Sequence, residues 1–154
     1  MTVYEVLPHV GVGPVRLGMS RDEVRRVMTG PCQPFRKGPF AAHETDAFHR
    51  SGFQVFYGGE SPVVDYIELS RDSGFTASYR GVDVFAAPAE RVIALFAHDA
   101  PFDPRHPELG YSYIFPGLDL SLWRPTLPDS PEDPEGREFA TIGVGAAGYY
   151  GARA

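Results

Sequence analysis

The chain has 154 residues, of which 43% are hydrophobic and 22% are charged. This composition is typical of a globular protein and excludes a disordered chain. The net charge of −6 argues against a general nucleic-acid binder, because such proteins usually carry a basic face. The single cysteine, Cys32, excludes an internal disulfide, and no apolar run is long enough to cross a membrane.

The start of the chain, MTVYEVLPHVGVG, predicts a cytoplasmic protein. It lacks the basic residues, the long apolar run and the small-residue cleavage site of a signal peptide. We therefore expect no membrane partner, and the acidic charge leads us to expect no nucleic-acid partner.

The first element predicted from the sequence is a short helix over residues 20–28. Ser20 and Glu23 form an S-x-x-E capping box, in which each side chain satisfies a free backbone N–H of the other residue. Gly30-Pro31 ends the helix. The apolar residues that recur at helical spacing, and that we expect to face a core, are Val24, Val27 and Met28.

The same pattern returns in the second half of the chain. Residues 81–85 predict a strand, and Pro88 suits the first turn of a helix, where its missing N–H costs nothing. The apolar residues of this second helix are Val92, Leu95 and Phe96. Two pairs of predicted strands also align, 52–57 with 117–122 and 64–69 with 139–144.

The matching order and apolar phase of the two halves indicate an internal duplication. We predict an α+β fold made of two tandem units, residues 1–78 and 79–154, each with one helix and antiparallel strands. The strands share one sheet, and both helices lie on one side of it. The segments predicted to be loops, rich in proline and glycine, are 30–45, 97–110 and 124–138. The tail, residues 148–154, is expected to fray beyond its tyrosines.

Residues 15–24, VRLGMSRDEV, with the Gly30-Pro31 that follows, resemble the opening signature of a group of small modules. The group comprises the β-lactamase inhibitory protein and the outer-membrane lipoprotein module of the SmpA/OmlA type. The resemblance implies a turn into a helix, then an antiparallel sheet, and the inhibitory protein has two such units in tandem. It is strict over residues 15–31, and the chain lacks the leader, lipidated cysteine and cysteine pairs of those families. The resemblance thus implies the fold, but not inhibition of a β-lactamase or a role in outer-membrane assembly.

Residues 118–123 alternate between leucine and other side chains, as in a strand with one buried face. The inward residues expected in the core are Leu118, Leu120, Leu122 and, from the aligned strands, Ile67 and Ile142. The outward residues predicted to form a binding face are Trp123, Phe56, Tyr66, Phe139, Asp119 and Glu68. Aromatic side chains among short polar ones are typical of a protein-binding surface. The alternative is that a loop, the tail or a second copy of the chain covers these rings.

Two groups of potential metal ligands lack the spacing of known sites, so we predict no metal and no cofactor. The first group is His43, Glu44, Asp46 and His49, and the second is His98, Asp99, Asp103 and His106. No catalytic motif surrounds Cys32, which we expect to be a small side chain under a loop. The first helix also carries Arg21, Arg25 and Arg26, which predict a solvated face.

These patterns favour a non-catalytic protein-binding module, of the inhibitor or immunity type, that uses the aromatic sheet face. The expected partner is another protein, or a second copy of the chain bound through the same face. The alternative is a small enzyme or ligand-binding protein with a pocket between the halves, near His43, His49 or His98. Three or more polar side chains converging in an apolar pocket would favour the alternative.

Overall fold

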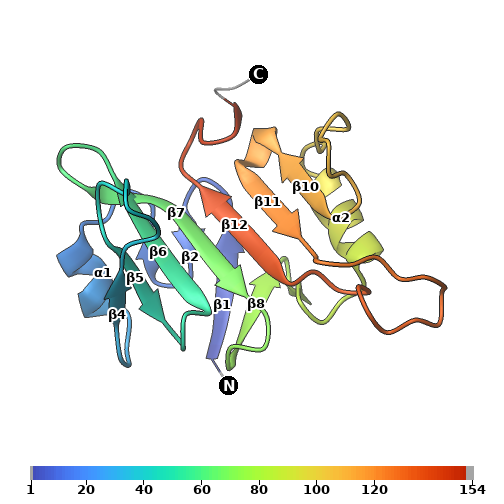
Figure 1. Ribbon diagram of the computed structural model, residues 1–154, viewed down its shortest axis with the longest axis horizontal. Coiled ribbons are helices and arrows are strands. Elements are labelled where there is room, and N and C mark those ends of the chain that lie inside the picture. Colours follow the sequence, from blue (N-terminus) through green and yellow to red (C-terminus); the bar gives the residue numbers. More distant parts are fainter. Residues whose placement is uncertain (1, 152–154) are drawn as a thin grey trace.

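The fold is mostly β, and the prediction of an α+β arrangement of two helix-plus-strand units is wrong. A computed structural model describes residues 2–151, with 35% in strands and only two short α-helices. The strands form two sheets, one of seven strands and one of five (Figure 1).

In the larger sheet every strand is antiparallel to its neighbours. In spatial order its strands are β10 (Ser112–Phe115), β11 (Leu120–Trp123), β12 (Thr141–Gly145), β7 (Val63–Ser70), β6 (Phe53–Gly58), β5 (Thr45–Phe48) and β4 (Gln33–Phe35).

The smaller sheet joins the start of the chain to its middle. In spatial order its strands are β3 (Val15–Arg16), β2 (Gly11–Val12), β1 (Thr2–Leu7), β8 (Phe75–Tyr79) and β9 (Val82–Asp83). Strands β1 and β8 are parallel, with Thr2 opposite Phe75. The remaining pairs are antiparallel.

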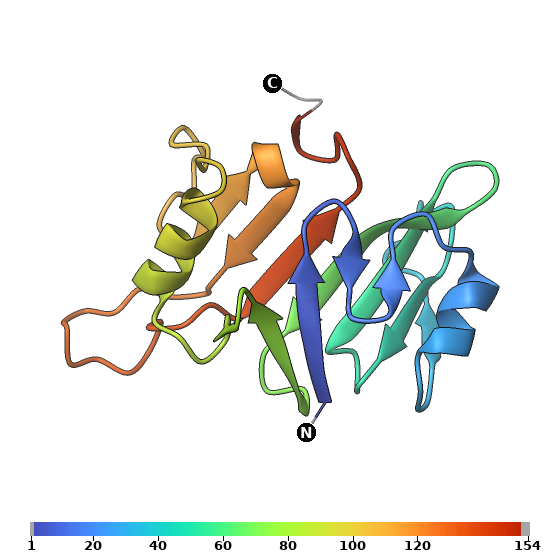
Figure 2. The ribbon, with the colours of Figure 1, turned by 180° about the vertical axis from the view of Figure 1, so that it is seen from behind.

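The smaller sheet and both helices lie on the same side of the larger sheet. Figure 2 shows α1 (Arg21–Val27) and α2 (Ala89–Ala97) near its two ends, with β1, β2 and β8 between them. The helices have 7 and 9 residues. At about 1.5 Å per residue they are about 10–14 Å long, whereas seven strands spaced by about 4.8 Å span about 29 Å. Because two such helices leave the middle of the sheet uncovered, a second sheet fills that space, which explains the error in the predicted fold.

Helix α1 begins as predicted. The Ser20 side chain accepts a hydrogen bond from the Glu23 amide at 3.2 Å, and the Glu23 carboxylate accepts one from the Ser20 amide at 3.0 Å. The capping box is therefore confirmed. Val24 and Met28 are buried, but Val27 is 37% exposed and does not belong to the core.

The core lies between the larger sheet and the layer behind it. The predicted core residues that are buried are Val24, Met28, Ile67, Val92, Phe96, Leu120, Leu122 and Ile142. Leu95 and Leu118 are only partly buried. Leu118 belongs to a 3-10 turn, η1 (Pro116–Leu118), and not to the predicted strand. Asp119 follows this turn with a left-handed backbone, φ 48°, so that β11 starts at Leu120.

The boundary predicted between residues 78 and 79 falls inside β8, and the division into two repeats stays a prediction. Among the described residues, no helix is long and apolar enough to cross a membrane.

Candidate functional site

The outer face of the larger sheet is the face turned away from the helices and the smaller sheet. Residues paired across antiparallel strands share one face, and Phe56 pairs with Tyr66. Glu68 lies two residues further along β7, and Trp123 alternates with the buried Leu122 in β11. The predicted outer face thus brings together Phe56, Tyr66, Glu68 and Trp123.

The tail covers the centre of this face. The Tyr149 ring stacks on Tyr66, with centroids 4.7 Å apart, and the Tyr150 hydroxyl bonds to the Ser121 hydroxyl at 3.0 Å. Gly143 makes room for this arrangement, because a Cβ there would lie 1.9 Å from the Tyr66 hydroxyl oxygen. Burial and the neighbouring Tyr150 raise the pKa of Tyr66 above its ordinary value, so the ring stays neutral.

Asp119 holds this tail in place and is buried, with 3% exposed, instead of lying on the surface as predicted. Its carboxylate accepts hydrogen bonds from the amides of Gly148 at 3.0 Å, Tyr150 at 2.9 Å and Gly151 at 3.4 Å. The His9 Nε2 atom lies 3.0 Å from the same carboxylate. Burial acts to raise the pKa of Asp119, but the three amides and His9 outweigh it and hold the pKa below its ordinary value. The tail is therefore anchored as far as Gly151, the first residue predicted to fray, and residues 152–154 lie outside the described residues.

Phe139 is fully buried and does not belong to the outer face, so that prediction is wrong. Its ring packs edge-on against Tyr113, and the Arg124 guanidinium lies 5.4 Å from its centroid. The chain bends at Ala140, and β12 begins only at Thr141. Strict alternation stops at that bend, which turns Phe139 inward.

Lys37 covers the end of the outer face opposite β11. Its Nζ atom lies 4.8 Å from the centre of the Phe56 ring and 3.6 Å from a carboxylate oxygen of Glu68. Lys37 belongs to the loop between β4 and β5, where Phe40 is 98% exposed. Phe56 and Glu68 therefore contact a basic side chain of the protein itself.

Trp123 remains open to solvent, at the β10–β11 end of the larger sheet (Figure 1). Trp123 is 42% exposed, Tyr111 is 40% exposed and Leu109 is 39% exposed. They line one hollow of about 380 Å³, which we call the Trp123 hollow. The residues that line it are Pro107, Glu108, Leu109, Tyr111, Trp123, Arg124 and Pro125.

Arg124 fixes the walls of the Trp123 hollow. It is buried, its amide donates to the Tyr111 carbonyl at 2.9 Å, and its guanidinium donates to the carbonyls of Gly110 and Gly136, both at 2.9 Å. The contact with Gly136 ties down the loop over residues 125–138. That loop carries five acidic side chains, Asp129, Glu132, Asp133, Glu135 and Glu138, against the single basic Arg137.

Two of the helix arginines, Arg21 and Arg25, bind a buried carboxylate that was not predicted from the sequence. Asp46 is fully buried in β5 and bonds to Arg21 at 2.9 Å, to Arg25 at 2.8 and 3.1 Å, and to the Tyr57 hydroxyl at 2.9 Å. Burial acts to raise the pKa of Asp46, but its bonds to Arg25 and Tyr57 and the charge of Arg21 hold the pKa below its ordinary value. Arg25 and Arg26 both remain exposed as predicted, and Arg26 bonds to a carbonyl of its own helix.

The histidines of the first predicted ligand group are held apart by other partners. The Nε2 atom of His49 bonds to the Tyr4 hydroxyl at 2.7 Å, and that of His43 bonds to the Gly59 carbonyl at 2.9 Å. Within residues 2–151, no three His, Cys, Asp or Glu side chains gather as a metal ion would require. Burial and the nearby Asp46 carboxylate raise the pKa of the Cys32 thiol, which disfavours the thiolate.

In the second predicted ligand group, Asp99 belongs to an ion pair. Its carboxylate accepts bonds from Arg80 at 2.8 and 3.0 Å and from the Tyr79 hydroxyl. Exposed His98 lies beside it, 3.7 Å away. Asp103 and His106 accept bonds from amides two residues further on, as turn-forming side chains do.

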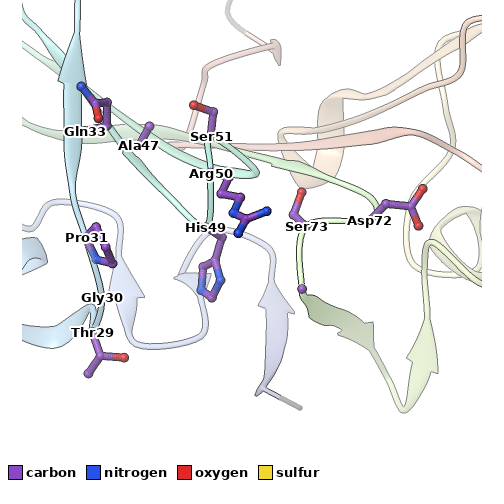
Figure 3. Close-up of a pocket in the computed structure, with 11 residues that line it drawn as sticks. Thr29, Gly30, Pro31, Gln33, Ala47, His49, Arg50, Ser51, Asp72 and Ser73 are labelled. Carbon is purple, nitrogen blue, oxygen red and sulfur yellow. The ribbon is translucent and has the colours of Figure 1, made fainter.

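A second hollow, of about 700 Å³, lies apart from the Trp123 hollow, and we call it the His49 hollow (Figure 3). The alternative predicted from the sequence placed a pocket between the two halves, near His43, His49 or His98, whereas the residues lining this hollow all lie within 29–74. It is lined by the turn between β5 and β6, the turn between β7 and β8, and the segment that follows α1. The residues that line it are Thr29, Gly30, Pro31, Gln33, Ala47, His49, Arg50, Ser51, Asp72, Ser73 and Gly74.

No protein-family model, curated protein or solved structure matches the chain. The resemblance carried by residues 15–31 therefore stays a prediction, and the function has to be argued from the geometry of these surfaces.

Proposed function

We propose that the protein is a non-catalytic recognition module that binds a protein partner through the Trp123 hollow. The observation that carries the proposal is the exposure of Trp123, Tyr111 and Leu109 around one hollow with a fixed wall. Large apolar side chains left in water forgo about 1.5–3 kcal/mol of burial each. Tryptophan and tyrosine are also the residues on which binding energy most often concentrates at protein interfaces.

The chemistry of the hollow fits a partner that presents a cationic side chain. Glu108 lines the hollow beside the two aromatic rings, and the acidic loop over residues 125–138 is tied to the same wall through Arg124. The face of a tryptophan or tyrosine ring attracts Lys or Arg, by about 0.5–2 kcal/mol depending on how far the pair is desolvated. A net charge of −6 attracts a basic partner at longer range.

The proposed surface is narrower than the face expected from the sequence. The tail covers Tyr66, and Lys37 covers Phe56. Trp123 remains exposed. An inhibitor or immunity-type protein that neutralises a basic target fits this acidic, aromatic surface. A second copy of the chain fits it less well, because like charges on the two copies would repel.

A peptide titration tests the proposal. Trp123 is the only tryptophan, so its fluorescence reports on the hollow directly. A synthetic peptide of alternating arginine and proline should give a saturable blue shift, and the same peptide with citrulline in place of arginine should not. Calorimetry should show that Trp123→Ala weakens binding by about tenfold or more, or about 1.4 kcal/mol.

Phe40→Ala is the matched control, since Phe40 is a fully exposed aromatic residue outside the hollow. This variant should bind the arginine peptide like the unmodified protein. Equal binding of the arginine and citrulline peptides, or equal loss in Phe40→Ala, would contradict a cation-selective hollow. Self-association that Trp123→Ala abolishes would assign the surface to a second copy instead.

A further inference from the structure

The turn between β5 and β6 has an unfavourable backbone. His49, Arg50 and Ser51 have φ of 51°, 56° and 72°, three consecutive residues other than glycine in the left-handed region. There the Cβ atom crowds the following carbonyl oxygen, which is why glycine or asparagine usually takes such positions. The amide of Gly52 closes the turn on the His49 carbonyl at 3.0 Å. Glycines would close this turn with less strain, so a use for the three side chains would explain their presence.

The packing around this turn gives the His49 hollow a rigid floor. The His49 ring lies 5.5 Å from the centroid of Tyr4 and 5.0 Å from that of Phe75. The β7–β8 turn touches it closely, because a Cβ on Gly52 would lie 2.0 Å from the Ser73 hydroxyl oxygen. His49 is thus held in one orientation, and its Nδ1 atom has no hydrogen-bond partner within residues 2–151.

Arg50 brings an uncompensated positive charge to this hollow. Its guanidinium makes no hydrogen bond or ion pair with any other described residue. Figure 3 shows it between His49 and Ser73, while Asp72 points away from them. Asp72 also lines the hollow, but its carboxylate is 90% exposed and lies 3.7 Å from Arg71.

Two other polar side chains of the hollow, Ser51 and Gln33, are also unused. Over the part of the chain that the structure describes, the Ser51 hydroxyl and the Gln33 amide make no side-chain hydrogen bond. Both line the hollow, and both can donate hydrogen bonds. The hollow therefore offers a cation and neutral donors, and no carboxylate is directed toward them.

We propose that the His49 hollow binds a small molecule bearing a carboxylate or phosphate group. The planar guanidinium of Arg50 matches either oxyanion with two parallel hydrogen bonds. Ser51, Gln33 and the unused ring nitrogen of His49 supply further polar contacts. A hollow of about 700 Å³ is the size of small-molecule sites in general. This site is separate from the Trp123 hollow, so either proposal can fail without the other.

An NMR titration tests the site with two probes, inorganic phosphate and succinate, at constant ionic strength. At least one should produce saturable shifts of the Arg50 Nε–H and of the amides of Ser51 and Gly74. Stronger binding of phosphate would indicate a phosphorylated ligand, and stronger binding of succinate would indicate a carboxylate. Shifts that do not saturate with either probe would overturn the proposal.

Two substitutions at Arg50 separate binding from folding. Arg50→Gln should weaken binding of the preferred probe about tenfold, since a hydrogen-bonded charge is lost. Arg71→Gln, on the same edge but outside the hollow, should leave the affinity unchanged. Arg50→Gly should abolish binding and raise the melting temperature, because it relieves the left-handed strain. Unaltered binding in Arg50→Gln would overturn the proposal.

Discussion

Asp46 is the residue at which burial and charge oppose each other most strongly. Its carboxylate is fully buried, and a buried charge is tolerated only when ion pairs and hydrogen bonds satisfy it. Arg21 and Arg25 supply the charge from α1, and the Tyr57 hydroxyl supplies a bond from β6. The two arginine contacts fix a helix of 7 residues, too short to be stable alone, onto the larger sheet.

Removing the Tyr57 hydroxyl tests the contribution of that bond. Tyr57→Phe should lower the free energy of unfolding by about 1.5–3 kcal/mol, the range for a hydrogen bond to a charged group. Urea denaturation measures it. The matched control is Tyr113→Phe, since the Tyr113 hydroxyl bonds to no other described residue. That change should cost less than about 0.5 kcal/mol. Equal losses in the two variants would show that the cluster around Asp46 does not depend on Tyr57.

At the scale of single residues, the sequence predicts which side chains of a regular strand point inward and which point outward. Alternation correctly places Leu120 and Leu122 inward and Trp123 outward, because the pleat of a strand fixes these directions. It fails at Asp119 and Phe139, where a left-handed residue and a bend interrupt the strand. Neither interruption has a glycine or proline at that position to signal it.

At the scale of elements, the missed part of the fold is the smaller sheet. The signal for β1 is present, since Val3 and Glu5 are exposed and alternate with buried Tyr4 and Val6. Its pairing is not predictable in the same way, because Thr2 pairs in parallel with Phe75, far along the chain. The position of the His49 hollow was not predicted either, because the two turns that form it are separate in the sequence and come together only through packing.

The burial of Leu120 in β11 predicts a large loss of stability when this side chain is shortened. Leu120→Ala should lower the free energy of unfolding by about 2–5 kcal/mol, because it leaves a cavity in a packed core. Leu109→Ala, at the Trp123 hollow, removes the same atoms from a side chain that is 39% exposed. It should cost less than about 1 kcal/mol. Chemical denaturation of both variants measures the difference, and similar losses would mean that Leu120 does not face the packed core.

At the scale of the whole molecule, both faces of the larger sheet are partly covered. Helices and the smaller sheet cover the inner face (Figure 2), and the tail and Lys37 cover the middle and one end of the outer face. The Trp123 hollow lies at the β10–β11 end, and this confinement is why the surface proposed for recognition is small. Sequence reasoning found its central residue, Trp123, but not Tyr111 or Leu109, which belong to a segment predicted to be a loop or left unassigned.

The anchoring of the tail should depend on pH through Asp119. The pKa of this carboxylate is held below its ordinary value of 3.8 by the amides of Gly148, Tyr150 and Gly151 and by His9. A group whose pKa is lowered by folding contributes stability in full above its unfolded pKa, and that stability is lost as the pH falls through the folded pKa. The tail should therefore stay bound at neutral pH and detach below the ordinary range of aspartate.

Amide hydrogen exchange at Gly148 and Tyr150 measures this detachment. Protection of both amides should fall as the pH drops below 3.8, after correction for the intrinsic exchange rate, while core amides such as that of Ile142 stay protected. Asp119→Asn is the sharpest variant, because asparagine tolerates the left-handed backbone but replaces an accepting oxygen with a donor. It should lower the protection of the tail at neutral pH by about tenfold, the scale of one hydrogen bond to a charged group. Full protection in this variant would mean that Tyr149 and Tyr150 hold the tail without the carboxylate.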